Sequence, residues 1–163
     1  MVQPYLIALA MSKGIPMLWQ GQEFGENYYL PDFGAGRVAL LRALRWDLFY
    51  DPSGQGIITL VRKLLRIRHS RTHIRSGAHY FFNEGDRYQS RGVLMFARYA
   101  GASYTLVALN IGEADQTVPF WFPIAGNYLE ELHGGGLDLH GVVALQETSL
   151  TIPPHYGRIW TTL

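Results

Sequence analysis

The sequence has no cysteine, no long apolar run and no large excess of charge of either sign. The absence of cysteine excludes disulfide scaffolds, thiolate metal sites and cysteine nucleophiles, and it fits a reducing compartment. The longest apolar runs extend over only a few residues, so we expect no transmembrane helix and no membrane partner. Residues 1–11 carry no basic side chain ahead of their apolar stretch, which makes a poor signal peptide and predicts a cytoplasmic location.

What the sequence does contain is enough apolar material for a core. The 163 residues are 48% hydrophobic and 17% charged, a balance that predicts a packed globular chain rather than a disordered one. Residues 1–75 hold ten Lys and Arg against five Asp and Glu, giving +5, whereas residues 76–163 hold four against eight, giving −4. Because such a charge step often marks a boundary between structural units, we divide the chain into domains 1–75 and 76–163.

The first 75 residues combine helical spacing with one short apolar run. A first helix is predicted over residues 4–13 and an amphipathic one over residues 56–71, the second with its apolar face formed by Ile57, Leu60, Val61, Leu64, Leu65 and Arg68. Between them, residues 15–19 are continuously apolar, which is typical of a strand covered on both faces in a parallel sheet. No other segment supplies parallel neighbours for it, so we expect this chain to be the end of something larger.

After residue 76 the pattern changes to short β-rich runs separated by Gly, Pro, Asn and Asp. Eight such runs with regular turn signals predict an antiparallel β-sandwich. The runs cover residues 79–83, 92–99, 104–110, 116–120, 128–133, 142–145, 149–152 and 156–162. The predicted fold class is therefore an α+β fragment, in which N-terminal helices and one parallel-type strand precede an all-β antiparallel sandwich.

The residues around the predicted strand form a motif. A Gly-x-Pro, an apolar pair, an aromatic residue and Gly-x-Glu follow one another in Gly14-Ile15-Pro16-Met17-Leu18-Trp19-Gln20-Gly21-Gln22-Glu23-Phe24-Gly25. This motif resembles the eighth barrel strand of the alpha-amylase superfamily, glycoside hydrolase family 13. Residues 107–110 and 152–159 likewise resemble parts of the C-terminal β-sandwich of that family, called domain C.

The resemblance implies a fold and an activity. Residues 1–75 would be the C-terminal end of a (β/α)8 catalytic barrel, with strand eight at 15–19 and the final helix at 56–71, and residues 76–163 would be domain C. The full-length parent would act on α-glucosidic bonds of starch- or glycogen-like glucans by a retaining mechanism, which needs two carboxyl groups about 5 Å apart. In the family these groups lie at the ends of earlier strands. The resemblance therefore assigns no catalytic residue, metal ligand or cofactor to this chain, and we expect the isolated chain to be inactive.

Three residues at and just beyond the end of the predicted strand are candidates for contacting the α-glucan substrate. Active sites of barrels lie at the carboxyl ends of their strands, where Trp19, Gln20 and Glu23 would lie. The amide and carboxylate can hold sugar hydroxyls or support the catalytic carboxylates, and Trp19, with Tyr28 and Tyr29, can stack on sugar rings. The structural alternatives are that Glu23 pairs with an arginine or caps a turn, and that Trp19 packs beside the barrel.

A different function, that of a stand-alone carbohydrate-binding or structural module, would rest on the aromatic residues of the β half. A sugar-stacking platform could be formed by Phe81, Phe82, Phe120, Trp121, Phe122 and Tyr128. Aromatic residues at strand positions are more often part of the core, however, and a sandwich fold by itself implies no function.

The remaining charged and histidine-containing patterns favour structural roles. The basic residues between 62 and 75 indicate a solvated helix face rather than a nucleic-acid site, so we expect no nucleic-acid partner. His69 and His73 are read as surface histidines rather than a zinc pair, and Arg45 with Asp47 as an ion pair rather than a rim subsite. An unpaired strand and an apolar helix face predict that the isolated fragment forms a homo-oligomer.

Overall fold

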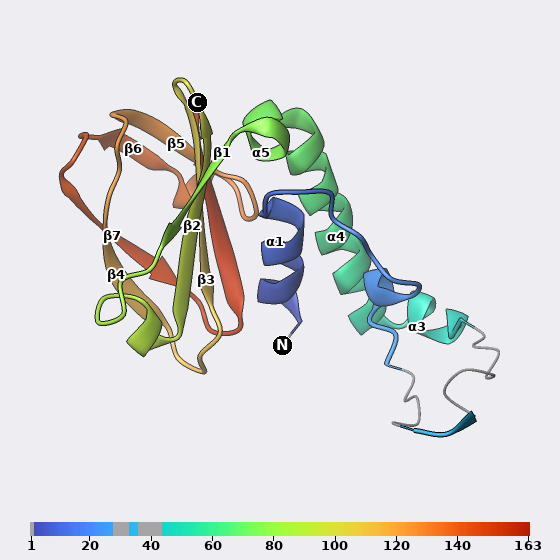
Figure 1. Ribbon diagram of the computed structural model, residues 1–163. Helices are drawn as coiled ribbons and strands as arrows, with labels where there is room; N and C mark the ends of the chain where they lie inside the picture. The colour runs from blue at the N-terminus through green and yellow to red at the C-terminus, as the bar shows by residue number, and fades with distance from the viewer. Residues whose placement is uncertain (1, 28–32, 36–43) are drawn as a thin grey trace. The chain divides into compact units, whose positions relative to one another are not determined.

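The computed structural model describes residues 2–27, 33–35 and 44–163. The chain forms two compact units, one composed of Met1–Pro16 with Lys63–Leu163 and the other of Met17–Arg62. The first unit carries the β-sandwich and the helices that pack on it, and the second carries the turn that follows the predicted strand (Figure 1).

The first unit is built on an antiparallel β-sandwich, which confirms the predicted fold class. Its larger sheet has the strand order β1-β2-β3-β8-β5-β6, and the smaller sheet pairs β4 with β7. The strands are β1 (Ala78–Phe82), β2 (Val93–Ala100), β3 (Ser103–Asn110), β4 (Gln116–Trp121), β5 (Gly126–Glu130), β6 (Leu139–Val142), β7 (Glu147–Ile152) and β8 (Tyr156–Thr162). Each predicted run has a counterpart among them, although β6 ends where the predicted run 142–145 begins.

One face of each sheet is buried against the other. Successive side chains along a strand point to opposite faces, so Met95 and Ala97 of β2 point into the space between the sheets. There they form a single buried cluster with Leu106 of β3, Phe120 of β4 and Leu150 of β7. This cluster is the core of the sandwich.

Helices cover the opposite face of the larger sheet (Figure 1). The helix α1 (Gln3–Met11) contacts β3 and β8, and α5 (Thr72–Ser76) contacts β2 and β3. Ile7 of α1 is fully buried, as are Val107 of β3 and Ile159 of β8, which face each other in the ladder. Because both faces of β3 are covered, its sequence is apolar almost throughout rather than alternating.

The long helix α4 (Pro52–Ser70) begins four residues earlier than predicted. The backbone N–H of Ser53 donates to the carboxylate of Asp51 at 2.8 Å, so Asp51 caps a helix that has proline in its first turn. The buried residues of α4 include Ile58, Leu60, Val61, Leu64, Ile67 and Arg68. Leu65, which we placed on the apolar face, is exposed. It follows Leu64, which lies at the centre of the buried face, and successive residues of a helix point in different directions.

The second unit packs around an aromatic cluster. It contains the 3₁₀ turn η1 (Gln22–Phe24), the short helix α3 (Trp46–Tyr50) and the first turns of α4. Phe24 is buried, with its ring centroid 5.9 Å from that of Trp46 and 6.2 Å from that of Phe49. None of the helices in the described parts of the chain has the length and apolar character that crossing a bilayer requires.

Candidate functional site

The segment predicted as barrel strand eight is not a strand in this structure. Residues 15–19 take part in no β-ladder, and Ile15, Met17 and Trp19 are 96%, 72% and 58% exposed. A strand exists only where a neighbour satisfies its backbone N–H and C=O groups, and the described residues provide no such neighbour for this segment. The strand prediction is therefore wrong for this chain, in which the side chains of Ile15, Met17 and Trp19 remain in solvent.

Directly after this segment the chain makes a tight turn. The backbone N–H groups of Gln22 and Phe24 donate to the carbonyl oxygens of Trp19 and Gly21 at 2.9 and 3.2 Å. The side chain of Gln22 closes the turn from the other side, because its Oε1 accepts the N–H of Trp19 at 2.7 Å. The backbone of the turn is thus held by both main-chain and side-chain hydrogen bonds.

Two glycines, Gly21 of the motif and Gly25 just after it, make this turn possible. Gly21 and Gly25 flank η1 with φ of 87° and 78°, a left-handed conformation that residues with a Cβ rarely adopt. A Cβ on Gly21 would lie 2.5 Å from the Cβ of Glu26, and one on Gly25 would lie 2.8 Å from Cδ1 of Ile57. The spacing of the two glycines therefore determines where Glu23, which lies between them, is placed.

The three predicted substrate residues share this one turn. Gln20 is exposed, Glu23 is half-buried within η1, and the Trp19 side chain lies largely in solvent. No hydrogen bond or ion pair of the Glu23 carboxylate occurs within the described residues, so the structural role considered for it has no support there. Tyr28 and Tyr29 lie outside the residues that the structure describes.

The neighbouring carboxylates differ from Glu23 because they have partners. Glu26 accepts the backbone N–H of Arg45 at 3.0 Å, and the Asp47 carboxylate lies 2.6 Å from the Arg45 guanidinium. That hydrogen bond lowers the pKa of Asp47. The predicted ion pair is confirmed, and Glu23 is left as the carboxylate of this turn that is available to a ligand.

The two histidines that we considered as a zinc pair lie in different environments. His69 is exposed, as expected, but His73 is buried, with its Nε2 2.7 Å from Oγ1 of Thr105, which is 2.9 Å from Oγ1 of Thr161. Burial lowers the pKa of His73. The prediction of a surface position is wrong for His73 because α5 packs on the sheet. Within the described residues, no three His, Asp or Glu side chains are grouped as metal ligands.

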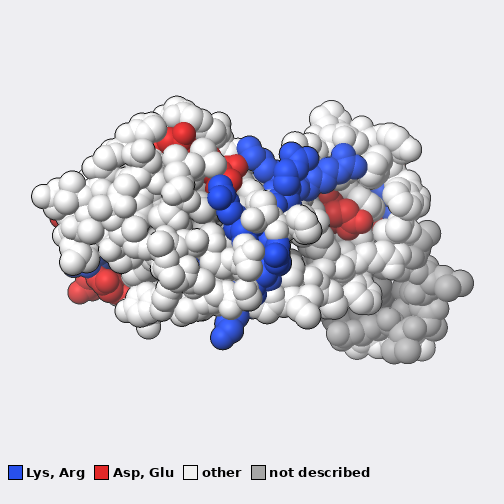
Figure 2. Space-filling model, turned by 90° about the horizontal axis from the view of Figure 1, so that it is seen from above, with Lys and Arg blue, Asp and Glu red and all other residues white. Residues whose placement is uncertain are grey.

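Several of the basic residues between 62 and 75 make internal contacts. Arg68 is buried and donates to backbone carbonyls, Arg71 pairs with Glu131 at 2.8 Å, and Lys63 donates to the carbonyl of Leu132. On the face shown in Figure 2, Lys and Arg side chains gather together with acidic side chains among them. Cations that are engaged in this way form a poor phosphate-binding surface, which favours their structural interpretation.

The aromatic residues of the sandwich divide between core and pocket. Phe120, Phe122 and Tyr128 are almost completely buried, so their rings cannot stack on a sugar. Phe82 and Trp121 instead line a pocket at one end of the sandwich. The six aromatic residues that we considered as a platform therefore do not form one exposed surface.

Three tyrosines that the sequence reasoning missed line the same pocket, namely Tyr80, Tyr99 and Tyr104. Two signals in the sequence point to them. Tyr80 stands two residues before Phe82, which places both on one side of β1, and the short β2–β3 hairpin pairs Tyr99 with Tyr104.

Comparison with known proteins gives a match in structure and none in sequence. No protein-family model matches this chain, and no curated protein matches it. An alpha-amylase from Geobacillus thermoleovorans, complexed with acarbose, matches with a TM-score of 0.70 and 20% identity over 98% of this chain and 32% of its own. AmyP in complex with maltose matches with a TM-score of 0.74 and 14% identity, over 97% of this chain and 33% of its own. The debranching enzyme of Nostoc punctiforme has a TM-score of 0.62 and 22% identity, over 96% of this chain and 30% of its own.

This chain thus spans about a third of the length of the solved structures that it matches. Nearly all of its residues are covered, and the part of those structures that it corresponds to is the C-terminal one. The likeness is one of fold, and it confirms at that level the resemblance seen in the sequence. The chain has the fold of the C-terminal part of alpha-amylase family enzymes.

Proposed function

We propose that this chain is the C-terminal segment of an alpha-amylase-type glycoside hydrolase that acts on α-glucosidic bonds of starch- or glycogen-like glucans. The observation that carries the proposal is the match of almost the whole chain to the C-terminal third of alpha-amylase and debranching-enzyme structures. Two of those structures are complexes with acarbose or maltose, which supports a glucan as the substrate. The motif at Gly14 to Glu23 adds support, because its Gly21 is a residue that the turn requires.

In this proposal the chain contributes structure and part of the substrate-binding rim. Retaining glycosidases need one carboxylate for attack and a second carboxyl group about 5 Å away for proton transfer. In the described part of the second unit, Glu26 and Asp47 are engaged with Arg45, which leaves Glu23 without a second available carboxyl group beside it. In the family that the chain resembles, the catalytic carboxylates lie at the ends of earlier strands, so we infer that the catalytic pair of the parent enzyme lies outside this chain.

The turn after residues 15–19 would face the sugar. The Gln20 amide and the Glu23 carboxylate would exchange hydrogen bonds with sugar hydroxyls, and the exposed Trp19 ring would stack on a pyranose. In the whole enzyme, neighbouring strands would pair with residues 15–19 and bury the apolar side chains that are exposed in this chain.

An activity assay tests the first part of the proposal. The isolated chain, incubated with starch, maltooligosaccharides or an activated α-glucoside, is expected to show no turnover above that of its Glu23→Gln variant. Turnover that Glu23→Gln abolishes would contradict the proposal. The coding sequence upstream of residue 1 tests the second part, because we expect it to encode a barrel with three carboxylates at the ends of earlier strands.

We further propose that the isolated chain associates through residues 15–19, since exposed apolar segments with unpaired backbone commonly do so. Light scattering should give a mass above that of one chain, and Met17→Lys should lower it. Leu145→Lys is the control, because Leu145 is equally exposed, at 73% against 72%, in a different part of the chain. A mass of one chain at every concentration would argue against association.

A second candidate function, which is compatible with the first, is carbohydrate binding by the β-sandwich itself. The pocket that contains Phe82 and Trp121 supports it. The burial of Phe120, Phe122 and Tyr128 limits any such site to that pocket.

A further inference from the structure

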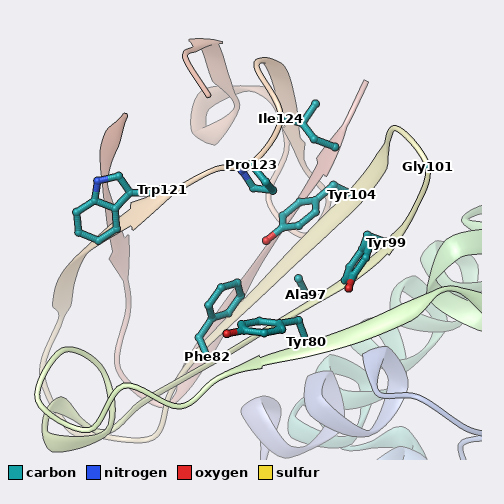
Figure 3. Close-up of a pocket in the computed structure, with 9 residues that line it drawn as sticks. All are labelled: Tyr80, Phe82, Ala97, Tyr99, Gly101, Tyr104, Trp121, Pro123 and Ile124. Carbon is teal, nitrogen blue, oxygen red and sulfur yellow. The ribbon is translucent and has the colours of Figure 1, made fainter. Parts of the chain in front are cut away.

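One end of the β-sandwich contains a pocket of about 390 Å³ between its two sheets (Figure 3). Its volume lies within the usual range for small-molecule sites. All of the lining residues are uncharged, and most are aromatic: Tyr80, Phe82, Ala97, Tyr99, Gly101, Tyr104, Trp121, Pro123 and Ile124. The larger sheet supplies one wall, and Trp121 at the end of β4 stands opposite (Figure 3).

The side-chain polar groups of this pocket have no protein partner among the residues that the structure describes. Tyr104 is only 5% exposed, yet within the described residues its hydroxyl makes no hydrogen bond, and it points into the pocket (Figure 3). The other two deeply buried tyrosines of the sandwich behave differently, because Tyr88 donates to the carbonyl of Pro119 at 2.9 Å and Tyr128 to that of Ile124 at 2.7 Å. The Tyr104 hydroxyl is not among the buried side-chain atoms that lack a partner, so it is accessible from the pocket, where a ligand or water can complete its hydrogen bonding.

Burial also keeps the Tyr104 hydroxyl protonated. It raises the pKa of Tyr104, with the neighbouring tyrosines Tyr128, Tyr99 and Tyr88 adding to the shift. The hydroxyl therefore remains a neutral group that both donates and accepts a hydrogen bond at any physiological pH.

The aromatic walls are held in place by contacts with one another and with residues outside the pocket. The guanidinium carbon of Arg87 lies 4.6 Å from the ring centroid of Trp121, and Arg87 also pairs with Glu84. The rings of Tyr99 and Tyr104 are stacked with centroids 6.3 Å apart. A ligand that enters the pocket would therefore meet rings that are already positioned, so little conformational entropy would be lost on binding.

The chemistry of the pocket selects among ligand classes. Uncharged walls offer nothing to a phosphate, a carboxylate or a cation that would repay its desolvation. A purely apolar ligand would leave the Tyr104 hydroxyl unpaired. A pyranose satisfies both requirements, since its C–H faces stack on aromatic rings and its hydroxyls exchange hydrogen bonds with tyrosine hydroxyls and the indole N–H.

We propose that this pocket, which we call the tyrosine pocket, binds a sugar unit of a neutral oligosaccharide at a site separate from the turn that carries Glu23. The assignment of the pocket rests on its own geometry. The choice of an α-1,4-glucan as the oligosaccharide rests on the proposed function.

The test is a calorimetric titration of the full chain with maltoheptaose. Tyr104→Phe removes a single hydroxyl and keeps the ring, so it should raise Kd by about 3- to 10-fold, the value of one hydrogen bond. Tyr80→Ala removes a wall that is 56% exposed, so it should leave the fold intact and raise Kd by about tenfold.

The matched control is Tyr5→Ala, because Tyr5 is similarly exposed, at 63%, but lies on α1 away from the pocket. It should leave Kd unchanged. Trp19→Ala in the other unit is measured beside it to report binding at the turn. Binding that weakens in Trp19→Ala and not in the pocket variants would overturn the tyrosine pocket and favour the turn.

Cellohexaose, which has β-1,4 linkages, separates this inference from the proposed function. Binding of cellohexaose in place of maltoheptaose, with the same sensitivity to Tyr104→Phe, would support the pocket and contradict its assignment to an α-glucan. Absence of binding by both oligosaccharides at millimolar concentration would overturn the pocket as a sugar site, and would leave the proposed glycoside hydrolase fragment standing.

Discussion

The substitution Arg68→Met should destabilise the first unit strongly, because Arg68 completes the hydrogen bonding at the end of α1. Its guanidinium donates to the carbonyl oxygens of Ala10 at 2.7 Å and Ser12 at 2.9 Å, and also to that of Gly14. The last carbonyls of a helix have no partner within the helix, and a cation placed there also opposes the negative end of the helix dipole. Arg68 therefore joins α4 to α1 through three backbone groups.

The size of the effect follows from the burial of these groups. Arg68 and Ala10 are both only 7% exposed, so water cannot replace the lost donor at the Ala10 carbonyl, which costs about 1–3 kcal/mol. Ser12 is half-buried and Gly14 is exposed, so water can replace the donor there at smaller cost. Burial lowers the pKa of Arg68, a sign that desolvation offsets part of the gain. We expect a net loss of about 2–4 kcal/mol in the free energy of unfolding.

Urea denaturation followed by circular dichroism measures this loss, and thermal denaturation should show a midpoint lowered by about 4–16 °C, at about 2–4 °C per kcal/mol. Arg66→Met is the matched control, because Arg66 lies on the same helix and is exposed, and its loss should stay within about 0.5 kcal/mol. The loss in the free energy of unfolding for Arg68→Lys should lie between those for Arg68→Met and Arg66→Met, since an ammonium cannot bind three carbonyl oxygens in the way a guanidinium does. Equal stability of Arg68→Met and Arg66→Met would refute the reasoning.

Two further predictions concern pH and the turn. The pKa of His73 is lowered by burial and by the charges of Arg71 and Arg98, so below about pH 6.5 the unfolded chain binds a proton that the folded chain does not. The contribution of His73 to the free energy of unfolding should therefore be fully present above that pH. It should fall as the pH decreases, by at most about 1.4 kcal/mol per pH unit. His73→Gln should flatten this slope in urea titrations from pH 7 to 5, and an unchanged slope would contradict the assignment. Gly21→Ala should destabilise the Met17–Arg62 unit by about 1–3 kcal/mol and speed its limited proteolysis, whereas Gly56→Ala, at an open helical position, should not.

Most of the β-sandwich could be predicted from the sequence because its strands are bounded by strong turn residues. Alternation such as that along β2 marks both the strand and its two faces, and the structure has Met95 and Ala97 on one side and Phe96 and Arg98 buried on the other. The position of β6 was less well predicted, because His140 and Gly141 interrupt its apolar pattern.

The motif located the candidate turn in the sequence, but it could not show whether residues 15–19 before the turn form a strand. The sequence placed Trp19, Gln20 and Glu23 in one short segment, since residues so close in sequence must lie close in space. Whether residues 15–19 form a strand depends on hydrogen-bonding partners, which no property of the segment itself can supply.

Local pattern by itself thus determined the two longer helices, the strands of the sandwich and the fold class, because these depend on neighbours within a few residues. The tertiary structure decided which side chains are buried. It turned His73 inward, used Arg68 to cap α1, enclosed Phe120 in the core and left the Tyr104 hydroxyl facing a pocket. The physical reason is that burial depends on which elements pack on each face, and those elements lie tens of residues apart in the chain.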